Sequence, residues 1–115
     1  MKELINVFKA LSDETRIRIM KVLLEKDNVC VCQVMEALNI SQTRASRNLK
    51  ILKEAGLIND KREGIWIHYT VNKGKRGCCT EAVNALMKKS LNDVEVIKKD
   101  RERLKKTKKK HDRHR

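Results

Sequence analysis

Hydrophobic residues recur at helical spacing through the first half of the chain. They predict helices over residues 2–11, 14–26, 28–38 and 42–56. Ser12 and Asp13 stand where the second helix needs a cap, and Ser41 is placed to cap the fourth. Gly56 follows the last apolar position of the fourth helix, as a C-terminal capping glycine does. The connection "NIS" between the third and fourth helices is short enough to make a tight turn.

After Gly56 the pattern changes from the period of a helix to that of a strand. In "LINDKREGIWIHYTV", residues 57–71, apolar and polar positions alternate on both sides of "KREG", which predicts two strands with a tip at residues 61–64. From Cys79 onward the helical spacing returns and predicts one long final helix. Its apolar stripe comprises Val83, Leu86, Met87, Leu91, Val94, Ile97 and Leu104.

This order of helices, tight turn, ribbon and final helix is typical of a winged helix-turn-helix domain. We expect a mainly α fold with a two-stranded β-wing (α+β), formed by one domain over residues 1–97. Aromatic residues make up only 3% of the 115-residue chain, so its core is thin. We therefore expect a homodimer formed through the terminal helices, which buries further apolar surface.

The formal net charge of +13 is uneven along the chain, since residues 98–115 hold eleven basic and three acidic residues. We expect that segment to be a basic C-terminal tail, frayed or disordered, and the excess charge fits a polyanion such as nucleic acid. No apolar run reaches the length that spans a bilayer, so no membrane partner is expected. The N-terminus lacks the features of a signal peptide, and we expect a cytoplasmic protein.

The predicted fourth helix has the two faces that a DNA recognition helix needs. Ala45, Leu49 and Leu52 supply an apolar face for the core. Gln42 and Arg44 lie outside that stripe and suit adenine and guanine edges respectively. The other predicted contacts to phosphates or bases are Ser41, Thr43, Ser46, Arg47, Lys50 and, at the hairpin tip, Lys61 and Arg62. The expected partner is double-stranded operator DNA, bound by a dimer on a pseudo-palindrome.

Cys30 and Cys32 stand at the start of the predicted third helix. The dipole and free N–H groups of a helix N-terminus favour thiolate, which is the form that binds metals. Residues two apart diverge on a regular helix, so joint ligation requires an irregular or distorted first turn. Ion binding would then bend the helix that supports the recognition helix and disfavour the DNA-bound geometry.

Several motifs in order resemble the ArsR/SmtB family of metal-responsive bacterial repressors. They are "ALSDETRIRI", the "CVC" of the third helix, "SQTRASRNL" and "EAGLINDKREGIWIHY", within residues 4–71. The resemblance implies a homodimer that leaves its operator when a metal or metalloid binds. The "CVC" is similar to that of arsenical and antimonial sensors, in which As(III) or Sb(III) takes a third thiolate three residues after the second cysteine. Met35 stands there in this chain, and the family often has His where Asn48 stands.

Cys78 and Cys79 are the candidates to complete the site, since basic residues precede them and a helix follows. The leading interpretation is a three-sulfur As(III) or Sb(III) site that uses Cys30, Cys32 and one of the later pair. A four-sulfur Cd, Pb or Zn site, thiol oxidation or persulfide sensing, and purely structural cysteines stay open.

The alternative of another class is a constitutive architectural DNA-binding protein, driven by charge. A thiol enzyme is disfavoured because the cysteine spacings are C-x-C and C-C rather than C-x-x-C. No acid or base group can be placed beside these cysteines from the sequence, so we do not expect an enzyme.

Overall fold

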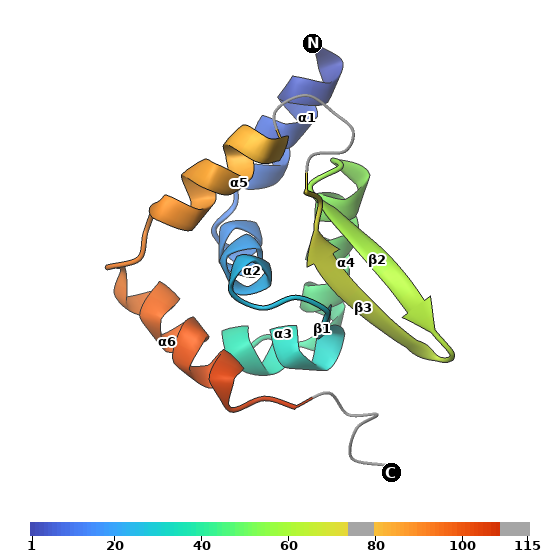
Figure 1. Ribbon diagram of the computed structural model, residues 1–115, viewed down its shortest axis with the longest axis vertical. Coiled ribbons are helices and arrows are strands. Elements are labelled where there is room, and N and C mark those ends of the chain that lie inside the picture. Colours follow the sequence, from blue (N-terminus) through green and yellow to red (C-terminus); the bar gives the residue numbers. More distant parts are fainter. Residues whose placement is uncertain (74–79, 109–115) are drawn as a thin grey trace.

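A computed structural model describes residues 1–73 and 80–108 of the chain. The helices are α1 (Lys2–Leu11), α2 (Glu14–Glu25), α3 (Val31–Leu38), α4 (Gln42–Glu54), α5 (Thr80–Lys89) and α6 (Glu95–Lys105). The strands are β1 (Val29–Cys30), β2 (Ile58–Glu63) and β3 (Trp66–Val71). Figure 1 shows α2 at the centre of the molecule and the β2–β3 hairpin projecting from one side as a wing. The predicted winged helix-turn-helix fold is confirmed.

Helix boundaries lie where the sequence places its capping residues. The side chains of Asp13 and Ser41 each accept the backbone N–H three residues further on, at 3.1 and 3.2 Å. Gly56, at φ +81°, follows α4. The N–H groups of Gly56 and Leu57 bond back to carbonyls of the last turn at 3.0 and 3.1 Å, which is a Schellman motif. These caps fix the two ends of the predicted recognition helix.

The hydrophobic core lies between the helices and the inner face of the sheet. Its largest fully buried apolar residues are Ile19, Met20, Leu23, Val29, Val34, Leu49, Leu52, Leu57 and Ile58. The predicted core face of α4 is confirmed, because Ala45, Leu49 and Leu52 are completely buried. In the described part of the chain, no helix is long and apolar enough to cross a membrane.

The sheet has a third strand that the sequence did not predict, and its order is β1-β3-β2. The prediction that the third helix starts at residue 28 is wrong, because Val29 and Cys30 pair with β3 as an extended segment. The predicted tip is also displaced. Lys61 and Arg62 lie in β2, and the turn falls at Gly64 and Ile65, where Gly64 takes the left-handed φ of +64° that glycine readily adopts.

The single long final helix predicted from the apolar stripe is wrong, because α5 and α6 are separate helices. Lys21 of α2, only 6% exposed, ends α5 by donating from Nζ to the carbonyls of Met87 and Ser90 at 2.7 and 2.6 Å. It also donates to Asn92 Oδ1 at 2.8 Å. Burial lowers the pKa of the Lys21 ammonium group. Leu91 takes a left-handed φ of +67°, and the chain then turns back.

The turn brings α6 alongside α3 (Figure 1). Ile97 and Leu104 of the predicted stripe are therefore buried within this chain, whereas Leu86 is 63% exposed. The predicted start of the basic tail at residue 98 lies inside α6. Asp100 and Thr107 are also buried, so packed structure continues well beyond the predicted domain boundary.

Candidate DNA interface and thiol site

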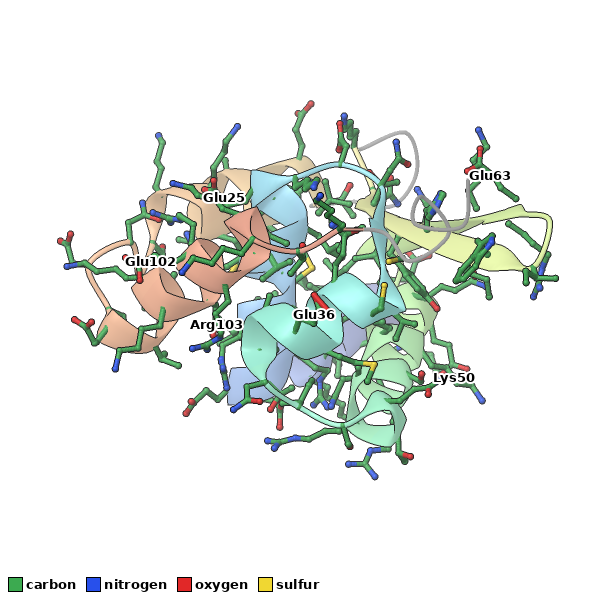
Figure 2. All side chains as sticks on the ribbon, turned by 90° about the horizontal axis from the view of Figure 1, so that it is seen from below. Glu25, Glu36, Lys50, Glu63, Glu102 and Arg103 are labelled. Carbon is green, nitrogen blue, oxygen red and sulfur yellow. The ribbon has the colours of Figure 1, made fainter. Side chains whose placement is uncertain are left out.

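The predicted DNA-contacting side chains of the fourth helix lie at the N-cap and along the first turns of α4. They are Ser41, Gln42, Thr43, Arg44, Ser46, Arg47 and Lys50, all of which are exposed. Figure 2 shows Lys50 projecting outward from α4. Ser41, which caps the N-terminus of α4, is exposed together with Gln42 and Thr43, so this end of the helix is accessible to solvent. The predicted contacts of this helix are thus all accessible to solvent.

Two side chains of α4 are tethered to α2. Arg44 Nη2 donates to Thr15 Oγ1 at 2.8 Å. Asn48 is only 5% exposed, and its Oδ1 accepts from Arg16 Nη1 at 3.0 Å. Its Nδ2 donates to the Arg44 carbonyl at 2.9 Å. Asn48 therefore links α4 to α2, and the sequence pattern did not identify this role.

The wing presents charges of both signs. Lys61 and Arg62 are exposed in β2, and Ile65 in the turn is 82% exposed. Glu63 Oε1 lies 2.9 Å from Nδ1 of the buried His68 on β3. The predicted basic residues are thus available on the hairpin, although they lie along its strand rather than at its turn.

Cys30 is the N-cap of α3 rather than a member of its first turn. Its sulfur accepts the N–H of Gln33, and Gln33 Oε1 accepts the Cys30 N–H at 3.2 Å, which completes a reciprocal capping box. Cys30 is extended, at φ −86° and ψ 165°, whereas Cys32 lies in the helix. The pair therefore spans a strand-to-helix junction rather than two positions of one regular helix, so the divergence expected of residues two apart on a helix does not apply to it.

Cys30 is 2% exposed and Cys32 is half-buried, and neither forms a disulfide. Met35 is half-buried and packs against the core. Cys78 and Cys79 lie outside the described residues. Within residues 1–73 and 80–108, no group of three or more His, Cys, Asp or Glu residues is arranged to hold a metal ion. Among the described residues, the thiol pair therefore offers two candidate ligands.

Comparisons with known proteins agree with this architecture. The model of the bacterial regulatory protein arsR family matches residues 13–60. The arsenical resistance operon repressor of Bacillus subtilis is 37% identical over 84 residues, which is 73% of each chain. This chain belongs to the ArsR family. The family and fold are those of DNA-binding transcriptional regulators.

Two further relatives define the extent of the similarity. The arsenical resistance operon repressor of Escherichia coli K12 is 44% identical over 68 residues, or 59% of this chain and 58% of that protein. The chain thus spans little more than half the length of that relative. The homodimeric winged helix-turn-helix domain Mb0332 of Mycobacterium bovis superposes with a TM-score of 0.63 at 29% identity, covering 74% of each chain.

Proposed function

We propose that this ArsR-family chain is a homodimeric repressor that releases operator DNA when As(III) or Sb(III) binds its cysteine thiolates. The observation that carries the proposal is the position of the thiol pair. Cys30 caps α3, Cys32 lies in its first turn, and α3 immediately precedes the recognition helix α4. The arsenical resistance repressors to which the chain is similar support a metalloid as the inducer.

Binding to double-stranded operator DNA is supported by the exposed polar face of α4 and by the net charge of +13. Gln42 would read base edges, and Arg44 would do so with the guanidinium N–H groups that do not bond to Thr15. Arg47 and Lys50 would contact phosphates. A homodimer is supported by Phe8 and Leu86, which are 62% and 63% exposed in the single chain, and by the homodimeric structural relative.

Ion binding would act on the first turn of α3. The sulfur of Cys30 accepts the Gln33 N–H, and ligation of an ion would engage the sulfur lone pairs elsewhere. α3 packs against α4, so a displaced α3 changes the position of the recognition helix. In a dimer, a change in the separation of two recognition helices disfavours simultaneous binding to both half-sites.

The third sulfur is assigned to Cys78 or Cys79, because a neutral thioether at Met35 cannot replace a thiolate. Trivalent arsenic and antimony favour soft sulfur ligands. The two described thiols are one fewer than the three thiolates that the proposed site requires. A site that used all four cysteines would instead suit Cd, Pb or Zn.

Operator release by arsenite, followed by fluorescence anisotropy, tests the proposal. The parent protein should release DNA, whereas Cys30→Ser and Cys32→Ser should stay bound at the same arsenite concentration. Met35→Leu is the matched control, because it conserves volume without removing a thiol and should respond like the parent. Full release by Cys32→Ser would contradict ligation by the pair.

A second arm locates the third sulfur. The double variant Cys78→Ser, Cys79→Ser should lose most of its arsenite response while it keeps operator affinity. A full response would show that the later cysteines take no part. If cadmium releases the operator DNA and arsenite does not, the result would contradict the three-sulfur site and support the four-sulfur site.

A further inference from the structure

A chain of hydrogen bonds joins the cap of α3 to the end of α6. Gln33 Oε1 accepts the Cys30 N–H at 3.2 Å, and Gln33 Nε2 donates to Thr107 Oγ1 at 3.0 Å. Thr107 Oγ1 in turn donates to the Leu104 carbonyl at 2.7 Å. Gln33 and Thr107 are 0% and 7% exposed. In such a buried position water does not readily replace a broken bond, so each bond constrains its neighbours.

The same helix holds the opposite end of α3. Arg103 Nε donates to the Ala37 carbonyl at 2.8 Å, and Figure 2 shows Arg103 of α6 beside α3. Arg18 Nη2 donates to the Leu38 carbonyl at 3.1 Å. Asp100 of α6 accepts from both guanidinium groups, at 2.8 Å from Arg18 and 2.9 Å from Arg103. The helix that carries the thiol pair is therefore fixed at both ends by contacts that involve α6.

We propose that Gln33 and Thr107 are positioning residues that couple ion binding at Cys30 and Cys32 to the docking of α6 on α3. This inference rests on the proposed function, because it assumes that an ion engages these thiolates. Gln33 is bonded to Cys30 through both halves of the capping box and to Thr107 through its amide. Rearranging Cys30 around an ion therefore disturbs the bond that holds α6.

Docked α6 thus favours the cap in which Gln33 bonds to Cys30, and a bound ion weakens the docking of α6. Coupling between two such equilibria is reciprocal. If a bound ion lowers the equilibrium constant for docking of α6 by some factor, undocking of α6 raises the affinity for the ion by the same factor. α6 lies outside the residues that the family model matches, 13–60. The coupling adds a C-terminal determinant of inducer sensitivity to the domain.

Arsenite titration of the full chain without DNA tests one direction of this coupling. Thr107→Val keeps the shape of the side chain but removes the hydroxyl, and it should bind arsenite about 3- to 10-fold more tightly, the factor expected for one buried hydrogen bond. Thr107→Ser keeps the hydroxyl and should bind arsenite like the parent. Equal affinities of the Val and Ser variants would overturn the coupling.

Amide hydrogen exchange of the parent protein tests the other direction without any substitution. Saturating arsenite should speed exchange of the amides at residues 102–107. Arsenite binding with unchanged exchange in this segment would overturn the inference and leave the proposed function intact. Failure of the parent protein to bind arsenite at all would overturn the proposed function, and the inference with it.

Discussion

Arg18 of α2 and Asp100 of α6 form a bidentate ion pair inside the protein, with Nε–Oδ2 and Nη2–Oδ1 distances of 2.8 Å. Their side chains are 13% and 3% exposed. The hydrogen bond to Asp100 raises the pKa of the Arg18 guanidinium group above its usual value. This pair ties a C-terminal helix to the second helix of the domain, across 82 positions of sequence.

Replacing Asp100 by Ala should destabilise the fold, because it leaves the Arg18 guanidinium largely buried without its counter-charge. Breaking a buried pair in this way costs about 3–5 kcal/mol. We expect the lower end of that range, since Arg18 retains some contact with solvent. Urea denaturation measures the change in the free energy of unfolding.

The matched control is Asp93→Ala, which removes an exposed acid from the connection between α5 and α6. Its effect should stay within about 0.5 kcal/mol. Similar losses in the two variants would show that the ion pair contributes little and that α6 is held by its apolar contacts.

Tyr69 should titrate above the ordinary value for tyrosine. Burial raises the pKa of its phenol, and the Asp60 carboxylate on the neighbouring strand adds to the shift. The folded protein therefore holds this proton more tightly than the unfolded chain. The corresponding stability is fully present below about pH 10 and is lost as the pH rises through the raised pKa.

Alkaline titration followed by tyrosinate absorbance measures this directly, because Tyr69 is the only tyrosine in the chain. Asp60→Asn should lower the midpoint relative to the parent protein while burial keeps it above that of an exposed tyrosine. A parent midpoint equal to that of free tyrosine would contradict the environment described for β3.

Local signals in the sequence predicted most helix ends correctly. Ser41 and Gly56 mark the limits of α4 because each acts through the backbone of its own helix. The break between α5 and α6 could not be predicted in that way, since the apolar stripe continues in phase through Leu91. The donor that caps α5 is Lys21, which is 66 positions from Met87.

In the candidate thiol site too, the local features were predicted from the sequence and the long-range contact was not. Cys30 and Cys32 were predicted as ligands from their place at the start of the third helix, and the structure adds that Cys30 belongs to the sheet and caps α3. The tie from Gln33 to Thr107 could not be predicted, because glutamine in a helix and threonine in a basic segment are usually exposed. Only the return of α6 brings these two residues together.

Lys50 should contribute a phosphate contact if α4 is the recognition helix. Removing one phosphate contact lowers the slope of log affinity against log salt concentration by about 0.9 per protomer. Lys50→Ala should show this change on an operator fragment selected in vitro, measured by anisotropy over a range of salt concentrations. Lys88→Ala removes an equal charge from an exposed position on α5 and should leave the slope unchanged. Equal changes would favour the architectural, charge-driven alternative.

The exposed apolar residues of α1 and α5 should form the dimer interface. Phe8 and Leu86 are 62% and 63% exposed in the single chain, and large apolar side chains left in solvent mark association surfaces. Phe8→Glu should convert the dimer to a monomer in sedimentation equilibrium. The protomer should keep its fold by circular dichroism, since this side chain fills no part of the core. Ile65→Glu, at an 82% exposed position in the wing turn, is the control and should remain dimeric.

Operator binding then separates two interpretations of that monomer. If a dimer places two recognition helices on adjacent half-sites, the Phe8→Glu monomer should lose most of its operator affinity, because each half-site contact must form independently. A Phe8→Glu protein that stays dimeric would exclude α1 from the interface. A monomer that binds the operator as tightly as the parent would make the single chain the DNA-binding unit, and a mechanism based on the separation of two recognition helices would then fail.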